Sequence, residues 1–370
     1  MQVLPPLQSI QAHKGAIWSI CAFPSGLLVT AGGDGMLKSW KVEARTGRFL
    51  LLAEVTTPHS EVLLVRPSPR GVLLSAGHEG GIAVWEIEPV SGKLEQRQQL
   101  ELPDDRNHYN DRMLETHSGY LLAWASGTAG RPALSRWSET ERGFFFLQQL
   151  PIERASTFLE LPDGSLLSGD STGQICSWRP DTSSEGWEKT GTLQAHEGPL
   201  YALANLQNGD LLSAGGHEPQ LKVWRAHPFA EKWELVQVLN EHHSQIVEVM
   251  NGGPEELLSA DRGDRSVLGW RRHPEVLVWI MATDKSVLLQ RQNGRLRGCI
   301  DGALLLEDDG ASALSLWRKS EGAYKRTLVF NENRRGNLSV FVSLPEGMLI
   351  TGGWDGRLIS WRLGAGALTP

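Results

Sequence analysis

Residues 164–224 read GSLLSGDSTGQICSWRPDTSSEGWEKTGTLQAHEGPLYALANLQNGDLLSAGGHEPQLKVW and contain the same pattern twice. A pair of leucines is followed by a serine, a tight turn and a short run that closes on tryptophan, first at Trp178 and again 46 residues later at Trp224. Runs such as LYALANL and LKVW are short, apolar and rich in β-formers, and Gly, Asn, Asp or Pro bounds them. This is the pattern of strands joined by turns, and it predicts four strands in each repeat.

The repeat extends over the whole chain at spacings of 41 to 52 residues. Such a period is typical of the four-stranded blade of a β-propeller. We therefore predict an all-β fold, an eight-bladed β-propeller of four-stranded antiparallel blades, that forms a single domain over residues 1–370. Each blade is expected to end its third strand at one tryptophan, and the eight are Trp40, Trp85, Trp137, Trp178, Trp224, Trp270, Trp317 and Trp361.

The two ends of the chain predict how the ring closes. Only RLGAGALTP follows Trp361, so the last blade is expected to lack an outermost strand of its own. The N-terminal stretch LPPLQSIQAH is similar to TGTLQAH, the outer-strand sequence before the fifth unit. Residues of about 4 to 11 are therefore expected to complete the last blade and to remove an open sheet edge.

Composition limits the function. The net charge of -7 argues against non-specific nucleic-acid binding, which depends on cationic side chains. The sequence has no signal-peptide pattern at its start and no run of about 20 apolar residues, which predicts a protein outside membranes. Three cysteines without CxxC spacing favour small apolar fillers in a reducing compartment. The protein is therefore predicted to be cytoplasmic.

The repeats resemble the WD40 family. In that family a histidine before the first strand, a Ser or Thr, an aspartate and a tryptophan form a buried hydrogen-bonded set. The resemblance implies two complete sets here, His13, Thr30, Asp34 and Trp40 in the first unit and His242, Ser259, Asp264 and Trp270 in the sixth. Other units depart from the pattern, because Glu79, Thr172 and Ala311 stand in place of the aspartate and Arg334 in place of the last histidine.

WD40 proteins commonly hold peptides on the rim that carries the histidine loops and the aspartate turns. At rim positions that are mostly Gly or Ser, this chain has large aromatic or imidazole side chains, which are typical of binding hot spots. The alternative is that they pack locally as ordinary rim residues. Two arginines in the loop entering the last blade could add a grip on a carboxylate or phosphate. The predicted partner-binding residues are Trp18, His78, Tyr201, His217, Arg334, Arg335 and Trp354.

Six residues that directly follow the tryptophans are basic, which places a basic band toward the opposite face. Pairing with nearby acidic side chains is the simpler explanation, and an acidic partner is the alternative. These residues are Lys41, Arg179, Arg225, Arg271, Arg318 and Arg362.

The sequence contains no P-loop, GxGxxG or HExxH motif, and its GxSxG match, GDSTG at residues 169–173, is a turn between two predicted strands of a repeat and not a nucleophile elbow. The predicted function is therefore a noncatalytic protein-interaction scaffold, without cofactor or metal, that binds a peptide or a protein subunit on its central rim and is a monomer on its own. Membrane and nucleic acid are not expected as partners. The alternative is a propeller enzyme, a metal-assisted hydrolase with its site at the channel mouth. A permanent subunit of a larger complex, docked by its outer edge, is a third reading.

Overall fold

The computed structural model describes most of the chain between residues 2 and 363. Statements about structure concern these described residues. The positions within that range that are not described are 69, 79–80, 102–108, 117–118, 127–133, 141–142, 151–154, 181–186, 227–231, 254–255, 262–263, 266–270, 273–274, 282–286, 294, 301, 308–313, 322 and 331–337.

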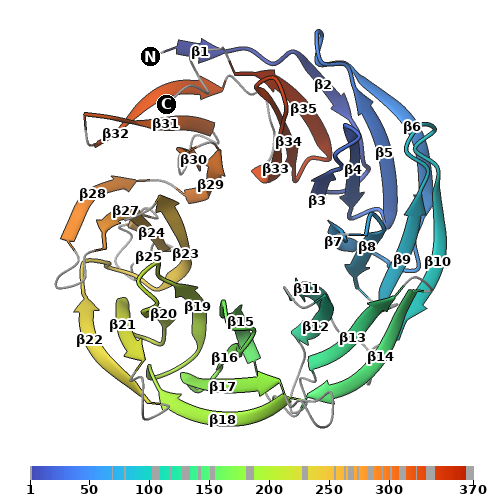
Figure 1. Ribbon diagram of the computed structural model, residues 1–370. Helices are drawn as coiled ribbons and strands as arrows, with labels where there is room; N and C mark the ends of the chain where they lie inside the picture. Colours follow the sequence, from blue (N-terminus) through green and yellow to red (C-terminus); the bar gives the residue numbers. More distant parts are fainter. Residues whose placement is uncertain are drawn as a thin grey trace.

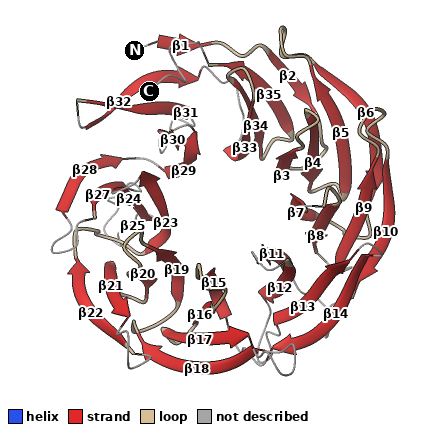
Figure 2. Cartoon of the chain, in the orientation of Figure 1, coloured by secondary structure: helices blue, strands red, loops and turns tan. Residues whose placement is uncertain are grey.

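Eight sheets stand around a ring, and every regular element in the described part of the chain is a strand (Figure 1, Figure 2). Within each blade the strands run antiparallel from the centre outward, which confirms the eight-bladed β-propeller. Blade 1 consists of β3 (Ile17–Ala22), β4 (Leu27–Gly32), β5 (Met36–Val42) and β6 (Phe49–Thr56). Blade 2 consists of β7 (Val62–Pro67), β8 (Leu73–Gly77), β9 (Ile82–Ile87) and β10 (Leu94–Leu100).

The next three blades repeat this order. Blade 3 consists of β11 (Tyr109–Glu115), β12 (Tyr120–Ser126), β13 (Leu134–Thr140) and β14 (Gly143–Leu150). Blade 4 consists of β15 (Ala155–Glu160), β16 (Leu166–Asp170), β17 (Gln174–Pro180) and β18 (Trp187–Gln194). Blade 5 consists of β19 (Leu200–Asn205), β20 (Leu211–Gly215), β21 (Gln220–Ala226) and β22 (Trp233–Leu239).

The last three blades contain the departures. Blade 6 consists of β23 (Ile246–Gly253), β24 (Glu256–Asp261), β27 (Glu275–Ile280) and β28 (Val287–Asn293), with a small hairpin of β25 (Asp264–Arg265) and β26 (Arg271–Arg272). Blade 7 consists of β29 (Arg295–Ile300), β30 (Ala303–Glu307), β31 (Leu314–Ser320) and β32 (Ala323–Phe330). Blade 8 consists of β33 (Leu338–Leu344), β34 (Met348–Gly353), β35 (Arg357–Arg362) and β2 (Gln8–Gln11).

The leucine pairs of the repeat lie on the second strand of each blade, where both faces are covered. In β4, for example, all six residues are buried, including both Leu27 and Leu28. Each blade is sandwiched between two neighbours, so the side chains above and below this strand enter two different cores. One of these cores joins Leu28 and Trp40 of blade 1 to Met348 and Ile350 of blade 8. The apolar pairs therefore bind the blades to one another as well as within themselves.

The N-terminal segment closes the ring, as predicted, but with different bounds. β2 pairs antiparallel with β35 from Gln8 opposite Ser360 to Gln11 opposite Arg357. Residues 2–4 instead form β1 (Gln2–Leu4), which pairs in parallel with β32 at the outer edge of blade 7. Pro5 and Pro6 lie between the two strands, and proline has no N–H to donate to a ladder. The expected closing segment of about residues 4 to 11 is thus corrected to residues 8–11.

The third strand of blade 6 ends at a different tryptophan from the one predicted. β27 pairs with β24, and Trp279 stands opposite Leu257 as the closing tryptophans do in other blades. Trp270 lies outside the described residues. The prediction was wrong because the 46-residue period was extended into a blade whose β24–β27 connection includes the extra hairpin β25–β26.

The junction between blades 8 and 1 is built like an internal blade boundary. Gly356 O accepts hydrogen bonds from Ala12 N and His13 N at 3.0 and 3.1 Å, and Gln11 Nε2 donates to His13 O. At the boundary of blades 4 and 5, Gly173 O accepts from Ala195 N and His196 N, and Gln194 Nε2 donates to His196 O. The recurrence of Gln-Ala-His therefore reflects one boundary geometry used twice.

Candidate functional site

The hydrogen-bonded set predicted for the first blade is complete. His13 Nδ1 lies 2.8 Å from Asp34 Oδ1, and His13 Nε2 lies 2.8 Å from Thr30 Oγ1. Trp40 Nε1 donates to the same Thr30 hydroxyl at 2.9 Å. Asp34 also accepts from the backbone N–H of Lys14, so the carboxylate ties the entry loop to the β4–β5 turn. These hydrogen bonds hold the backbone of the rim in place.

Burial and hydrogen bonding together set the protonation states of His13 and Asp34. Burial lowers the pKa of His13, and its contact with Asp34 compensates only in part. For Asp34, burial raises the pKa, but hydrogen bonds from His13 and from the backbone N–H groups of Lys14 and Met36 outweigh that effect and lower it overall. The set is therefore best described as a neutral imidazole beside a carboxylate.

The sixth blade has a complete set made of other residues than those predicted. His242 Nδ1 lies 3.1 Å from Asp261 Oδ2, and Ser259 Oγ lies 2.6 Å from His242 Nε2. Trp279 Nε1 donates to Ser259 at 2.8 Å. Asp261 and Trp279 thus replace the predicted Asp264 and Trp270. Asp264 lies in β25, three residues further along the chain.

In other blades, part of the set is seen among the described residues. The tryptophan donates to a Ser or Thr hydroxyl of the second strand in blades 2, 4, 5 and 8, at distances of 2.8 to 3.0 Å. In blade 5, His196 Nε2 contacts Ser213 Oγ, but His196 Nδ1 is buried without a hydrogen-bond partner. Burial and the nearby Lys222 lower the pKa of His196 to about 4.

Two tryptophans meet on the rim at the junction of blades 8 and 1. Trp18 on β3 and Trp354 in the β34–β35 turn have ring centroids 5.9 Å apart at an interplanar angle of 63°, an edge-to-face contact. Trp354 is 57% exposed, whereas Trp18 is half-buried and its Nε1 is buried without a hydrogen-bond partner. The sequence prediction that these two residues are neighbours is borne out. We refer to Trp18 and Trp354 as the rim tryptophan pair.

The backbone around this pair is held in place by glycines and by a serine bridge. Ser339 Oγ on β33 donates hydrogen bonds shared between Ile17 O at 2.5 Å and Gly352 O at 3.0 Å, which joins the inner strands of blades 8 and 1. A Cβ on Gly356, whose φ is +73°, would lie 2.3 Å from His13 O. Only glycine permits this approach. The rim tryptophan pair therefore sits on a fixed junction.

The remaining predicted rim residues lie in other blades. His78 follows β8, is half-buried, and is anchored through its backbone N–H to Glu61 O at 3.0 Å. Tyr201 is a half-buried residue of β19, and His217 is exposed in the turn after β20. Figure 1 places β19 on the opposite side of the ring from β3. The structure thus brings Trp18 and Trp354 together, whereas Tyr201 and His217 lie in blade 5 and His78 lies in blade 2.

Arg334 and Arg335, the other two predicted partner-binding residues, lie outside the described residues. The basic band of the opposite face is described in part. Arg225 pairs with Asp210, with Nη2 2.8 Å from Oδ2 and Nε 3.0 Å from Oδ1. Arg362 donates to the backbone carbonyl of Ala44 in the neighbouring blade. Pairing with an acidic side chain is therefore confirmed for Arg225, whereas the printed partner of Arg362 is a backbone carbonyl.

Within the described residues, no three His, Cys, Asp or Glu side chains come together in an arrangement that could hold a metal ion. In the same part of the chain the structure contains no helix that could cross a lipid bilayer.

Comparison with known proteins agrees with the fold. Residues 4–41 and 187–225 match the family model described as WD domain, G-beta repeat. A stretch of 107 residues is 34% identical to Echinoderm microtubule-associated protein-like 3 of Mus musculus, and the match covers 26% of this chain and 11% of that protein. The same protein of Homo sapiens is 35% identical over 71 residues, which cover 16% of this chain and 8% of its length.

Solved structures superpose over nearly the whole chain. The C-terminal WD40 domain of Sif2 gives a TM-score of 0.72 at 13% identity, with 99% of both chains covered. Sqt1 of Chaetomium thermophilum, crystallised bound to the N-terminus of the ribosomal protein L10, gives 0.71 at 13% identity over 97% of this chain and 100% of that chain. At this identity the likeness concerns the fold.

The ring of eight four-stranded blades and the buried His–Ser/Thr–Trp sets define a class of protein, the β-propellers with WD repeats. The family-model matches over residues 4–41 and 187–225 and the related proteins support this class, a WD40-repeat β-propeller.

Proposed function

We propose that this propeller is a noncatalytic protein-interaction platform that holds a peptide segment of a partner protein against the rim tryptophan pair. The observation that carries the proposal is the exposed indole of Trp354 standing edge-on to Trp18 over a rigid junction. Tryptophan anchors in a preformed setting are the residues that contribute most to binding at protein interfaces. Sqt1, which shares the fold, is known from a structure with a peptide segment of another protein.

A platform of this kind acts through shape rather than through chemistry. The two indoles form a corner that can pack against an apolar side chain, while the blade junction keeps both rings in register without a conformational change. A peptide that binds here loses conformational entropy. The propeller loses little, because Ser339 and Gly356 already order the backbone of the junction. Arg334 and Arg335 belong to this proposal as candidate contacts for a carboxylate or phosphate beside the corner.

The test starts from the native partner, recovered by affinity purification and identified by mass spectrometry. Its affinity is then measured for the wild-type protein and for the double variant Trp18→Ala, Trp354→Ala. The expected loss is about 2 kcal/mol or more, which corresponds to about 30-fold in Kd.

Phe145→Ala supplies the matched control, because Phe145 is 50% exposed but lies on the outer strand β14, away from the rim. This control should bind the partner like the wild type. Undiminished binding by a double variant with wild-type circular dichroism and melting temperature would remove the rim tryptophan pair as the site.

A further inference from the structure

The outer edge of one blade already carries an additional strand. β1 pairs in parallel with β32 at the edge of blade 7, from Gln2 opposite Leu328 to Leu4 opposite Phe330. In Figure 1, β1 lies on the outside of β32, and β6 forms the outer edge of blade 1. An edge strand presents backbone N–H and C=O groups with which a further strand can pair. The edge of β6 offers the same kind of site.

Two residues of β6 set this strand apart from most other outer strands. Leu50 stands opposite Lys41 and Leu51 opposite Trp40, and the two leucines are 55% and 44% exposed. Charged and polar side chains protect a sheet edge from unwanted pairing. At the same two pairing positions, blades 2, 4, 5 and 7 each have at least one such residue, in the pairs Glu95 and Gln96, Glu188 and Lys189, Glu234 and Leu235, and Lys325 and Arg326. Blade 1 has no such protection at these positions.

Cationic side chains flank Leu50. Lys41 lies opposite it on β5, and Arg48 precedes it by two residues, so both side chains project from the same face of the blade as Leu50. Arg45 is exposed in the hairpin between the two strands, and none of the three cations forms an ion pair within the described part of the chain. Residues 41–48 contain these three cations and one carboxylate, a net charge of +2 in a protein of net charge -7.

The outer strand of blade 3 has an apolar pair without these cations. Phe145 and Phe146 occupy the two positions and are both exposed. Phe145 stands opposite Ser138, however, where Leu50 stands opposite Lys41, and Gly143 holds the place of Arg48. Blade 1 therefore combines an apolar edge with positive charge, and this combination favours a segment that is both acidic and apolar.

β32 shows where on β6 an added strand would pair. The Phe49 N–H at the start of β6 donates to Gln8 Oε1 at 2.6 Å, and β32 has the same kind of contact at its start, with Gln290. β1 pairs beyond that contact, from Leu328 onward, and Ala53 holds the register position of Leu328 in β6, since each stands opposite the residue before the closing tryptophan. Three equivalent residues of β6 are therefore available for pairing, from Ala53 onward.

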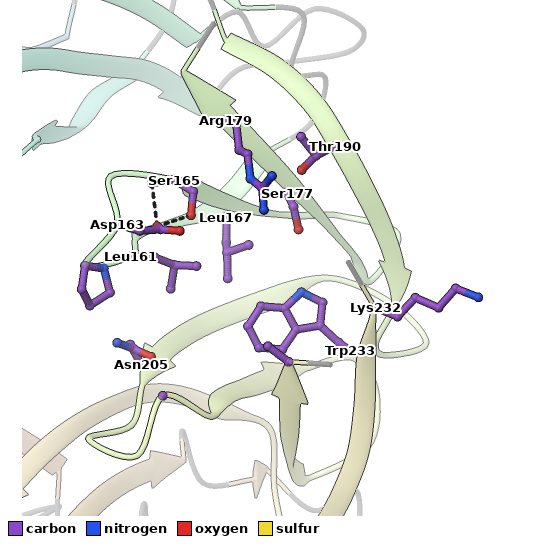
Figure 3. Close-up of a pocket in the computed structure, with 13 residues that line it drawn as sticks. Leu161, Asp163, Ser165, Leu167, Ser177, Arg179, Thr190, Asn205, Lys232 and Trp233 are labelled. Atoms are coloured by element: carbon purple, nitrogen blue, oxygen red, sulfur yellow. Dashed lines mark hydrogen bonds between the residues drawn. The ribbon is translucent and has the colours of Figure 1, made fainter. Parts of the chain in front are cut away.

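The cavity of about 700 Å³ between blades 4 and 5 is a separate feature (Figure 3). Thr190 and Trp233 are among its lining residues. The hairpin between two other lining residues, Ala226 and Lys232, lies outside the described residues. No binding site is inferred there.

We propose that the outer edge of β6 is a second docking surface, which receives an extended acidic and apolar segment of a partner protein as a fifth strand of blade 1. We call this surface the β6 edge, defined by Lys41, Arg48, Leu50, Leu51 and Ala53. The segment runs parallel to β6, as β1 runs parallel to β32. It places a carboxylate beside Arg48 and two consecutive apolar residues beside Leu50 and Leu51, and its following residues pair from Ala53 onward. Backbone hydrogen bonds give affinity, and the side chains on the two faces give selectivity.

The probe is a fluorescent synthetic peptide, Asp-Thr-Val-Val-Thr-Val-Lys-Val, designed to lie beside residues 48–55. Titration with the wild-type protein, followed by fluorescence anisotropy, should show saturable binding. A peptide with lysine in place of the aspartate should bind at least about threefold more weakly, because its ammonium group meets Arg48. Of two peptides N-methylated at the seventh position or at the sixth and eighth, only one should bind, since alternate N–H groups of a strand face its neighbour.

Protein variants locate the binding. Leu50→Glu with Leu51→Glu should weaken the aspartate peptide by at least about tenfold, because charges replace two apolar contacts. Phe145→Glu with Phe146→Glu makes the matched change at the edge of β14 and should leave the affinity unaltered. Arg48→Glu should weaken the aspartate peptide and strengthen the lysine peptide, a reversal that damage to the fold would not produce.

The Trp18→Ala, Trp354→Ala double variant should bind the peptide like the wild type, so failure at the β6 edge and failure at the rim tryptophan pair are distinguishable. Absence of saturable binding, equal affinity for the aspartate and lysine peptides, equal binding of the two N-methylated peptides, or wild-type affinity in the Leu50→Glu, Leu51→Glu protein would each overturn the proposal. Dimerisation of the free protein that this double variant abolishes would assign the β6 edge to a second copy of the chain and would also overturn it.

Discussion

At the scale of single residues, the blades differ in whether the buried histidine of the hydrogen-bonded set has a partner for its Nδ1 atom. His13 and His242 each contact a carboxylate, whereas His196 has a buried Nδ1 with no partner. The turn after β20 explains the difference, because it reads Gly-His-Glu-Pro where the first blade has Gly-Asp-Gly. A neutral imidazole tolerates this surrounding, but an imidazolium does not.

Acid should therefore destabilise the protein through His196. Its pKa in the folded state is about 4, below the ordinary value of 6.5, so the unfolded state binds the proton first as the pH falls. The contribution of neutral His196 to the free energy of unfolding is fully present above about pH 6.5 and is lost as the pH falls toward about 4. Between about pH 7.5 and pH 5 this residue should cost about 2 kcal/mol in the free energy of unfolding. Urea melts at the two pH values measure the loss.

His196→Gln should flatten the pH dependence by that amount, and His217→Gln, at an exposed position, should leave it as in the wild type. An unchanged slope in His196→Gln would show that other groups carry the acid sensitivity.

The sixth blade offers a direct comparison of two aspartates. Asp261→Ala leaves the buried Nδ1 of His242 without a partner and should lower the free energy of unfolding by about 1–3 kcal/mol. Asp264→Ala should cost less, because the place in the set belongs to Asp261. Denaturant melts of both variants at neutral pH measure the two costs, and an equal cost would contradict the assignment.

Residue by residue, the sequence was informative wherever a repeat kept its length. The first blade's set and the contact of Trp18 with Trp354 were predictable, because both depend on local spacing and on the neighbourhood of the two ends. Asp261 and Trp279 were not predictable from the sequence. A nine-residue displacement of the third strand in blade 6 leaves another tryptophan, Trp270, at the regular period, so counting alone selects the wrong residue.

At the scale of elements, the N-terminal segment is a two-part clasp across blades 7 and 8. β2 supplies four residue pairs and places Ile10 in the core shared by blades 8 and 1. β1 supplies three parallel pairs, and its Val3 is 55% exposed. The QAH recurrence predicts β2, but β1 has no counterpart in any repeat and its parallel pairing leaves no periodic signal.

The two strands of the clasp should differ in their contribution to stability. Removal of residues 2–4 should change the melting temperature by a few degrees at most, because an exposed edge strand is lost. Removal of residues 2–11 should lower the free energy of unfolding by more than about 3 kcal/mol, because ladder hydrogen bonds and buried apolar contacts are lost together. Calorimetry with size-exclusion chromatography distinguishes the two outcomes. Equal melting temperatures for both truncations would show that β2 does not close the ring.

At the scale of the molecule, the closing junction is one boundary among eight. Gly356 and Gln11 repeat the contacts of Gly173 and Gln194, and the first and last described strands, β1, β2 and β35, lie on the same part of the ring (Figure 1). The sequence predicts the ring because it is a sum of repeats.

A circular permutant tests the equivalence of the boundaries. A flexible linker joins residue 370 to residue 1, and new ends are opened between residues 183 and 184, so that β18 becomes the N-terminal strand and closes blade 4. The permutant should fold with a single unfolding transition and a melting temperature within about 5 °C of the parent, since it keeps every ladder. A monomer that fails to reach the parental circular dichroism spectrum would show that the natural junction is special.

Pairing of Gln8 with Ser360 also has a consequence for biosynthesis. The ladder joins residues 352 positions apart, so β2 leaves the ribosome long before β35 exists. At 5–20 residues per second, the interval is about 20–70 s. Throughout it, β2 has unpaired backbone groups while the intervening blades assemble, and its pairing with β35 carries a large loop-closure cost. Any nascent chain that terminates before β35 stays an open arc with two free edges, which is the kind of species that holdase chaperones retain and proteases remove.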